Sequence, residues 1–522
     1  MKKIFTTLVA GLMISAQVLA VSVKDVCGQF TGDLNIGGDP YPNKSVYLLP
    51  GVVDNTVTFV LPDFTYGGKG KLGNIVLPNI PMDANGQLTL ENASLYLDAI
   101  SLRASITILN NFVDDYDGTV YNSYVTANEA MILLSIEADL PEPIFVLFGG
   151  VPAHANNYVL PNGGFEGEWT NNEPAGWHSF GSATGLMADF VTSNTQQFIQ
   201  SDEVRPGSTG KNSALISSNM LFGVKANGNC TNGQINAGSM DATEAKGNYN
   251  FSDPANTGFN TPFQGRPDSV VFWAKYLPAD RNVANTETKA RMNTVVTTNN
   301  RYQDPELNND SVKHADYRIA SASIDYQATA DMGWQRLSAP FEYTNVALEQ
   351  APAYILATFS TNYTPGGGSS YSTGGLFGKS VLDTVFIDDV ELVYNKALTS
   401  FERNSKALEF TNKIAKVDEA YCDSCAKNAA TADGVSAQTF IAFDHAHKCI
   451  FVYVIADDYA QSGEYNLYRV NFTDSDTKDI DQTEGFENIR FGETRFEKVL
   501  IDGQLYIRSN DAWFNAAGVR VR

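Results

Sequence analysis

The sequence predicts an all-β protein of several domains. Short segments in which apolar and polar residues alternate recur along the chain, and the stretch 158–395 has almost no helical periodicity. Tyr and Phe are plentiful (24 and 30 residues), whereas only 18% of the residues are charged. Alternation with a period of two is the pattern of half-buried strands, and aromatic residues are enriched in strands. We expect an antiparallel barrel, then a jelly-roll sandwich, and then a small β domain with a hairpin tail.

Residues 1–20 carry the pattern of a secretory signal peptide. Lys2 and Lys3 precede an apolar run, and the small residues Val18 and Ala20 stand at the positions that signal peptidase reads. We therefore expect an exported protein, placed in the periplasm, on the outer-membrane surface or outside the cell. No other apolar run is long enough to span a bilayer, so we expect no transmembrane segment in the mature chain.

The balance of charges disfavours one class of partner. The formal net charge of the chain is −23. Nucleic acids and anionic lipids would be repelled by such a chain, because their phosphates carry charge of the same sign. We therefore expect no nucleic acid among its partners.

The segment 21–150 contains a series of alternating segments separated by turn residues. The predicted strands are 30–36, 57–61, 88–90, 104–109 and 131–136, and the predicted turns are 37–40, 83–86 and 114–118. Strands at this spacing indicate an antiparallel sandwich or barrel.

Two motifs of this segment resemble a known family. Gly-Asn-Ile-Val-Leu at 73–77 follows Phe-Val-Leu-Pro-Asp-Phe at 59–64, and together they resemble the calycin-like β-barrel domain of secreted Bacteroidota proteins. The resemblance covers about the whole of 21–150. It implies a barrel whose interior can hold one small apolar ligand. The alternative, which we favour, is an interior filled by the barrel's own side chains.

Two short segments bracket the middle of the chain. Asn-Gly-Gly-Phe-Glu at 162–166 predicts a strand that opens a domain, and Ile-Asp-Asp-Val-Glu-Leu at 387–392 predicts the strand that closes it. If the first and last strands pair, the region 158–395 has the outline of a β-jelly-roll.

Further motifs between these segments occur in a fixed order. They are Pro-x-Gly-Trp at 174–177, Pro-Phe-x-Gly-Arg-Pro at 262–267, an aromatic strand at 269–276 and a Gly/Ser-rich loop at 365–378. With the two bracketing segments, this order resembles the putative carbohydrate metabolism domain of Bacteroidota over nearly all of 158–395. The resemblance implies a fold similar to jelly-roll carbohydrate-binding modules, and a ligand made of sugars.

The end of the chain predicts further β structure. Alternating segments at 441–443, 449–455 and 465–470 predict a small Ig-like β domain within 396–490. Residues 491–522 predict a hairpin that resembles the C-terminal tails of exported Bacteroidota proteins, some of which are sorting signals. The alternative is an ordinary final hairpin of the third domain.

Three acids are the candidates for a metal site. Glu166 lies on the predicted first strand, and Asp388 and Asp389 lie on the predicted last strand, so antiparallel pairing would bring them to one edge. In jelly-roll sugar-binding modules, acids at matching positions help to hold a structural Ca²⁺, and the resemblance implies the same here. Calcium takes about six to eight oxygen ligands, of which a sequence shows only part. The alternative is that these acids cap strand ends or pair with Arg266.

Aromatic side chains are the candidates for a sugar platform, because the C–H faces of pyranose rings stack on flat rings. The candidates are Trp169, Tyr276, Trp334, Tyr363 and Tyr371. Trp169 stands among acids and asparagines, and the two loop tyrosines stand beside glycines, where loops often line a ligand site. Trp177 and Trp273 stand in apolar contexts and are expected in the core.

The cysteines of the C-terminal part leave several states open. Zinc would accept Cys422, Cys425 and Cys449 together with His445 and His447, but their spacing does not fit a familiar zinc finger. Exported proteins favour disulfides. We therefore expect a disulfide between Cys449 and one of the other two, with free thiols, a metal site and redox chemistry as the alternatives.

The sequence as a whole favours binding over catalysis. No nucleophile elbow, P-loop or dinucleotide fingerprint is present. Glycoside hydrolysis needs two carboxylates about 5–10 Å apart across a cleft, and no acid stands in a sharp motif. We expect non-catalytic glycan binding by a cell-envelope protein, whose partners are a glycan or other cell-surface proteins. The alternatives are a glycan-active hydrolase and a structural or adhesive surface protein.

Overall fold

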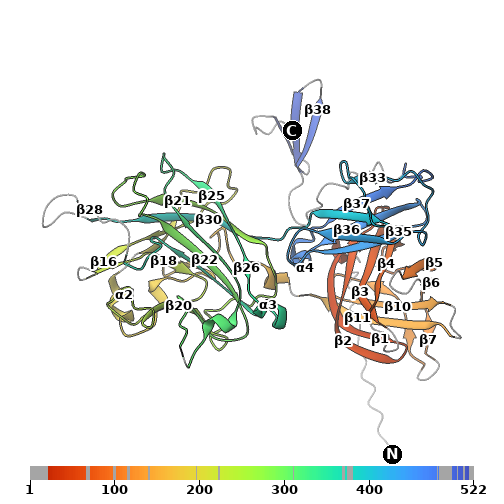
Figure 1. Cartoon of the computed structure of the whole chain (residues 1–522), viewed down its shortest axis with the longest axis horizontal. Helices are drawn as coiled ribbons and strands as arrows, with labels where there is room; N and C mark the ends of the chain where they lie inside the picture. Colours follow the sequence, from red (N-terminus) through yellow and green to blue (C-terminus); the bar gives the residue numbers. More distant parts are fainter. Residues whose placement is uncertain are drawn as a thin grey trace, which may run out of the picture.

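The structure is a computed structural model, and it is almost entirely β, as predicted (Figure 1). It describes residues 21–65, 71–97, 102–114, 118–138, 142–153, 155–194, 197–221, 224–309, 311–366, 371–372, 380–478, 480, 496–501, 504–509 and 512–515. The predicted signal peptide, 1–20, lies outside the described residues. Among the described residues, no helix is long and apolar enough to cross a membrane.

The N-terminal part is a nearly closed antiparallel barrel. Its strands follow the order β4-β3-β2-β1-β11-β10-β6-β5. Their bounds are β1 (Gly28–Ile36), β2 (Asp39–Pro50), β3 (Thr56–Thr65), β4 (Lys71–Pro81), β5 (Leu90–Leu97), β6 (Leu102–Ile108), β10 (Ala130–Glu137) and β11 (Ile144–Pro152). Short elements complete it: α1 (Val23–Val26), β7 (Phe112–Val113), β8 (Val120–Tyr121) and β9 (Tyr124–Val125). The alternating segments at 30–36, 57–61 and 131–136 therefore lie on strands, as predicted.

The barrel interior is filled by the barrel's own side chains. Phe30, Phe59, Ile106 and Phe148 are all buried there, as members of one continuous apolar cluster. Alternate residues of each strand point inward, so the apolar half of each period-two pattern supplies this core. The likeness to the calycin-like domain stays a prediction.

The outer face of the barrel is covered by the C-terminal part of the chain. There the four-stranded sheet β33-β37-β36-β35 packs on β2, β3 and β4 (Figure 1). Its strands and neighbours are β31 (Leu398–Arg403), β32 (Lys406–Ala407), β33 (Ile414–Lys416), β34 (Asn428–Ala432), β35 (Gln438–Asp444), β36 (Cys449–Ile455), α4 (Tyr459–Ser462) and β37 (Asn466–Asn471). The sequence suggested an Ig-like domain here. In the structure β33 and β37 are parallel, and the sheet shares its core with the barrel.

This shared core joins segments that are almost 400 residues apart. Tyr47, Leu49 and Val60 of the barrel pack with Phe451 and Tyr453 of β36 in one buried cluster. The Tyr453 and Thr58 hydroxyls lie 3.0 Å apart, and the Tyr459 hydroxyl donates to the Leu48 carbonyl at 2.8 Å. The hydroxyls are thus paired although they are buried, as burial requires.

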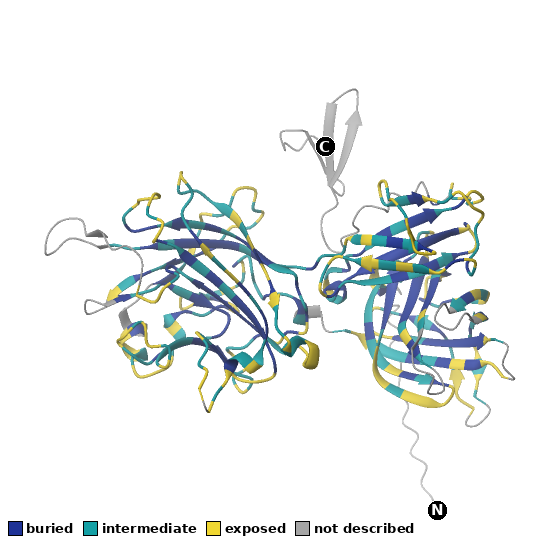
Figure 2. Ribbon diagram, viewed as in Figure 1, coloured by how far each residue is buried: buried dark blue, intermediate teal, exposed yellow. Residues whose placement is uncertain are grey.

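The middle of the chain is a sandwich of two five-stranded antiparallel sheets. One has the order β14-β15-β30-β21-β25 and the other β18-β27-β22-β24-β26. The first comprises β14 (Phe198–Ser201), β15 (Ser213–Ser217), β30 (Thr384–Val393), β21 (Ser269–Leu277) and β25 (Gln335–Pro340). The second comprises β18 (Asn229–Thr231), β27 (Tyr354–Ser360), β22 (Ala290–Thr297), β24 (Arg318–Tyr326) and β26 (Glu342–Tyr343). Figure 2 shows that much of the ribbon of these strands is coloured as buried. The core between the two sheets includes Trp177, Phe272 and Phe359.

A smaller sheet lies against β27 of this sandwich, and short elements connect the strands. The sheet β19-β20-β23 comprises β19 (Gln234–Ala237), β20 (Asn248–Ser252) and β23 (Tyr302–Asp304). The helical elements are η2 (Ala155–Tyr158), η3 (Phe180–Ser182), α2 (Ala188–Asn194), η4 (His314–Tyr317) and α3 (Val346–Glu349). The two-stranded pairs are β12 (Trp169–Thr170) with β13 (Glu173–Pro174), β16 (Asn219–Leu221) with β17 (Val224–Ala226), and β28 (Tyr371–Ser372) with β29 (Ser380–Val381).

The predicted pairing of the first and last strands of the sandwich is wrong. Residues 162–166 form a turn, with positive φ at Asn162 (49°) and Phe165 (57°). The predicted closing strand does lie in β30, but its partners are β15 and β21. A single backbone hydrogen bond, from the Val390 amide to the Gly163 carbonyl at 2.9 Å, joins β30 to the turn. The two left-handed residues, only three positions apart, turn the chain here, and no strand forms at 162–166.

The last strands form a three-stranded antiparallel sheet. These are β38 (Phe496–Ile501), β39 (Gln504–Ser509) and β40 (Ala512–Asn515). The predicted hairpin is therefore present as β38 and β39, with β40 added to it. A sorting role for this tail stays a prediction.

The shared core generates a prediction about stability. Phe451→Ala should lower the free energy of unfolding by about 3–5 kcal/mol, because it leaves a cavity in a buried cluster. Hydrogen exchange followed by mass spectrometry should show lost protection in β2–β4 of the barrel as well as in β35–β37, with the sandwich unchanged. Val435→Ala, at an exposed position, is the control. Loss confined to β35–β37 would contradict a shared core.

Candidate functional site

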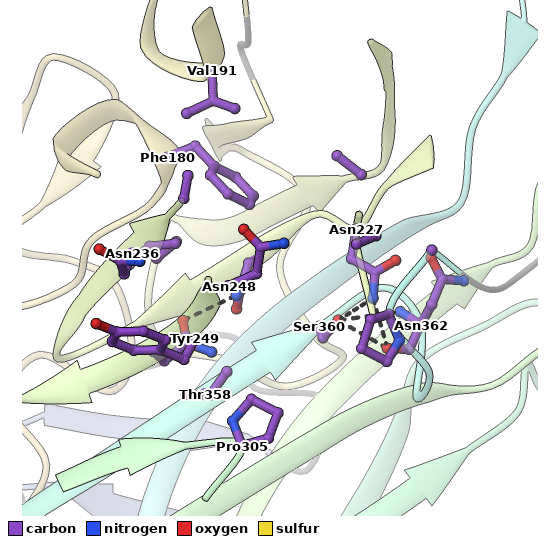
Figure 3. A pocket seen from close by; sticks show the side chains of 18 of the residues that line it. Phe180, Val191, Asn227, Asn236, Asn248, Tyr249, Pro305, Thr358, Ser360 and Asn362 are labelled. Atoms are coloured by element: carbon purple, nitrogen blue, oxygen red, sulfur yellow. Dashed lines mark hydrogen bonds between the residues drawn. The ribbon is translucent and has the colours of Figure 1, made fainter. Parts of the chain in front are cut away.

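A cavity of about 240 Å³ lies where the small sheet covers the sandwich (Figure 3). The five-stranded sheet contributes residues of β18, β22 and β27, and the small sheet contributes residues of β19, β20 and β23. Helix α2 and η3 complete the wall on one side. Asparagine is the commonest polar residue of the wall. The asparagines are Asn227, Asn229, Asn236, Asn248, Asn250, Asn293 and Asn362.

The side-chain oxygens of two of these asparagines have no hydrogen-bond partner. The Asn227 amide nitrogen donates to the Ser360 hydroxyl (3.3 Å) and to the Asn362 carbonyl (3.2 Å), as the dashed lines of Figure 3 show. The Asn229 amide nitrogen donates to Asn250 Oδ1 at 3.0 Å. The Oδ1 atoms of Asn227 and Asn229 are buried and accept no hydrogen bond. An unpaired buried acceptor costs about 1–3 kcal/mol. Because neither oxygen is exposed to the cavity, a donor brought by a ligand reaches it only if the amide turns.

Other asparagines of the wall are fixed by the backbone. Asn248 Nδ2 donates to the Ser239 and Asp241 carbonyls, and its Oδ1 accepts from two backbone amides of the same loop. The Asn236 amide donates to the Gly247 carbonyl at 2.6 Å. These side chains hold the loop that follows β19 against β20, and so they shape the cavity.

Two tyrosine rings belong to the wall. Tyr249 on β20 packs edge-on to Phe251, and the Arg301 guanidinium lies 5.6 Å from its ring centre. Tyr363 follows β27, and the Lys289 amine lies 5.6 Å from its ring centre. Neighbours of this kind hold each ring in place, which keeps a flat surface available at the cavity.

The charged side chains of the wall are paired. Arg291 makes two hydrogen bonds to the carboxylate of Asp325, at 2.6 and 3.0 Å, and Lys225 forms an ion pair with the buried Asp383. Asp304 carries the one carboxylate among the cavity-lining residues that the structure describes. Burial raises the pKa of Asp304 above its ordinary value, while its hydrogen bond with Asn293 and the charge of Arg291 act in the opposite direction.

The described side chains of the predicted aromatic platform do not come together at the cavity. Of its five members, Tyr363 lies at the cavity. Tyr276 is fully buried, so its assignment as a ligand-binding residue is wrong. Strand β21 points Phe272, Ala274 and Tyr276 into the core and turns Trp273 outward, where the Arg205 guanidinium lies 5.3 Å from its ring centre. The alternation on this strand is therefore the reverse of the one we expected.

The two predicted tryptophans lie half-buried and outside the cavity wall. The Trp169 ring packs on Phe198, and its indole N–H donates to the Phe165 carbonyl at 3.0 Å. The Trp334 ring stands edge-on to Phe386. Tyr371 lies on β28, and its side chain is outside the described residues.

The three predicted calcium ligands come close together, but they have other partners. Both carboxylate oxygens of Glu166 accept hydrogen bonds from Lys211 and Asn212, at 2.6 to 2.9 Å. Asp389 pairs with the Arg205 guanidinium at 2.5 Å, and Asp388 accepts from the Arg205 and Asp389 backbone amides. A divalent cation at this edge would have to compete with the Arg205 guanidinium for Asp389.

No described group of three or more His, Cys, Asp and Glu side chains is placed to hold a metal ion. Arg266, which we considered as the partner of these acids, instead lies at the junction with the C-terminal part, where its amide donates to Asp457 at 3.0 Å. Calcium stays a prediction.

The predicted disulfide has a different pairing. Cys422 is bonded to Cys425, with 5.5 Å between their Cα atoms. Cys449 is buried on β36 in the core shared with the barrel, so its predicted bond to one of these two is wrong. The histidines also have other neighbours: His447 Nδ1 lies 2.6 Å from Asp444, and His445 Nδ1 lies 3.2 Å from the Tyr421 hydroxyl.

The sequence did not lead us to predict the asparagines of the cavity as site residues. A signal was present in the repeated pattern Asn-x-Asn, at 227–229 and again at 248–250. Residues two apart on a strand share a face, so Asn248 and Asn250 of β20 lie on one side. Asn229 lies on β18, and Asn227 lies just before that strand. That the two faces meet depends on the packing of β20 over β18, which no local pattern shows.

Comparison with known proteins points to carbohydrates. Residues 161–393 match the family described as Putative carbohydrate metabolism domain. The match covers the sandwich that carries the cavity, and it spans less than half of the chain. No curated protein matches the chain.

Three solved structures illustrate what the chain is similar to. A putative glycoside hydrolase from Bacteroides vulgatus is 17% identical, with a TM-score of 0.28, over 42% of this chain and 85% of that one. Another from Bacteroides thetaiotaomicron is 15% identical, with a TM-score of 0.28, over 69% and 83%. A carbohydrate-binding module of the β-sandwich superfamily is 8% identical, with a TM-score of 0.20, over 66% and 96%. At such low TM-scores these similarities carry no argument about activity.

The acids at the edge of the sandwich generate a prediction about pH. Burial raises the pKa of Asp388 to about 6, above its ordinary value of 3.8. The folded state therefore holds the proton more tightly than the unfolded state, so this group's contribution to stability is present below pH 4 and is lost as the pH rises to 6. Arg205→Gln removes a positive charge and should raise the pKa further. NMR titration of the labelled carboxyl carbon measures both values; an equal or lower midpoint in the variant would contradict this.

Proposed function

We propose that this chain binds a glycan in the cavity of the sandwich and does not cleave it. The observation that carries the proposal is the pair of buried, unpartnered side-chain oxygens of Asn227 and Asn229 at the wall of the cavity. Sugar hydroxyls are the donors that fit such acceptors, and they desolvate at lower cost than charged groups do. The family match over 161–393 supports the same class of ligand.

The other walls of the cavity fit a neutral sugar. The Tyr249 and Tyr363 rings offer flat faces on which the C–H face of a pyranose can stack. Arg291 and Lys225 are already paired with Asp325 and Asp383, so neither charge is left over for a carboxylate or sulfate on the ligand. A protein with a net charge of −23 would also repel anionic glycans.

The carboxylates of the cavity favour binding over hydrolysis. Glycoside hydrolases of the common types use two carboxylates about 5–10 Å apart. Asp304 is the single acid among the cavity-lining residues that the structure describes. One carboxyl group can form a hydrogen bond with a sugar hydroxyl, but it lacks the second carboxylate that the reaction needs.

The first experiment is a glycan array on the full chain, followed by calorimetry on the glycan that binds best. Asn229→Ala should weaken binding about tenfold, because it removes an acceptor whose hydrogen bond with the ligand forms in a buried site. Tyr363→Ala should also weaken it. Asn282→Ala, at an exposed position of the same sandwich outside the cavity, should bind as the unchanged chain does.

Two outcomes would contradict the proposal. Binding that is equal in Asn229→Ala and the unchanged chain would place the glycan elsewhere. The absence of binding to any glycan would favour a structural or adhesive role. Repeating the array in EDTA tests the predicted calcium, since a structural ion would make binding depend on it.

The distinction from hydrolysis has its own test. We expect no release of reducing sugar when a bound oligosaccharide is incubated with the full chain, and we expect Asp304→Asn to keep binding within about threefold, since an amide can still donate a hydrogen bond to a hydroxyl. Product that appears with the unchanged chain and disappears with Asp304→Asn would assign a hydrolase instead.

A further inference from the structure

The cavity has two chemically different sides. The asparagines of β18, β20 and β22 lie on one side, together with the paired charges. The other side carries most of the apolar side chains, which come from η3, α2 and the residue before it, β19 and the loop after β19, although Asn236 and Ser239 of these segments also line the cavity. The apolar residues are Phe180, Met187, Phe190, Val191, Ile235, Met240 and Ala242. Figure 3 shows Phe180 and Val191 on the side away from Pro305 and Thr358.

Large apolar side chains also gather at the rim of this second side. Phe190 is 48% exposed and Met240 is 52% exposed, although both belong to the cavity wall. Leu186, next to the wall residue Met187, is 85% exposed. Single exposed apolar residues are common, whereas several at the mouth of one cavity mark a surface that a ligand or partner covers.

We propose that the ligand is a glycoside with an apolar aglycone, an alkyl or aryl group, which lies along α2 while the sugar meets Asn227 and Asn229. This inference rests on the proposed function and adds the class of ligand. A plain oligosaccharide presents hydroxyls on most of its edge and would leave the α2 side in contact with water. An apolar group on the anomeric oxygen would cover the α2 side in place of water, and its burial is favourable in proportion to its apolar area.

The extent of the apolar side decides between an aglycone and a smaller substituent. A single methyl group, such as that of an acetamido sugar, touches a few side chains at most. The apolar side here draws on four segments and continues to the exposed rim at Phe190 and Met240. An alkyl or aryl group reaches from the cavity to this rim, whereas a methyl group does not.

Matched pairs of ligands test the inference on the full chain. Methyl and phenyl β-D-glucopyranoside, and the same two glycosides of galactose, are titrated by ligand-observed NMR. The phenyl member of a pair should bind about tenfold more tightly, which corresponds to about 1.4 kcal/mol. Phe190→Ser and Met240→Ser should remove this gain. Leu348→Ser, which also replaces an exposed apolar residue but lies on α3 outside the cavity wall, is the control.

The outcomes separate this inference from the proposed function. Equal affinity for the methyl and phenyl glycosides, with Asn229→Ala still weakening both, overturns the aglycone and leaves glycan binding in place. Phenyl glycoside binding that Asn229→Ala does not change overturns glycan binding in the cavity, and the aglycone with it. No detectable binding of any of these glycosides overturns the inference. A phenyl gain that is lost in Phe190→Ser and kept in Leu348→Ser supports it.

Discussion

The rest of the structure depends on the burial of the barrel's outer face under the C-terminal sheet. Tyr47, Leu49 and Val60 point away from the barrel interior and would be exposed if the chain ended with the sandwich. Phe451 and Tyr453 cover them. The hydroxyls of Thr58 and Tyr453 form a hydrogen bond with each other, so neither is buried without a partner. The barrel and the C-terminal sheet therefore share one hydrophobic core, and the sandwich is inserted between them in the sequence.

This constraint ties the two ends of the sandwich to each other. The Tyr394 hydroxyl, where the chain leaves the sandwich, donates to the Tyr158 carbonyl where the chain arrives, at 2.7 Å. Asp268 accepts from the Asn395 and Val435 amides at 2.7 and 2.9 Å, which fixes the sandwich to the C-terminal part. Helix α2 lies on the side of the sandwich distant from α4 (Figure 1). The junction thus leaves the cavity free for a ligand to approach.

The sequence predicts those features that depend on residues close together in the chain, and it misses those that depend on tertiary packing. The barrel strands were predicted because a period-two pattern depends only on neighbours in the chain. The turn at 162–166 was missed because Phe165 takes a left-handed φ of 57° while its ring is buried against Trp177, and only tertiary packing maintains that conformation. The cavity was missed for the same reason: the bond from Asn229 to Asn250 joins different sheets.

Asparagine, rather than acid, suits a binding site in this chain. The protein already carries a strong negative charge, and a further buried carboxylate would be costly unless it took up a proton, as the raised pKa of Asp388 illustrates. An amide offers the same acceptor geometry to a hydroxyl without that cost, and it keeps its hydrogen-bonding pattern at any pH in the physiological range. The asparagine side chains of the cavity wall are therefore uncharged throughout that range.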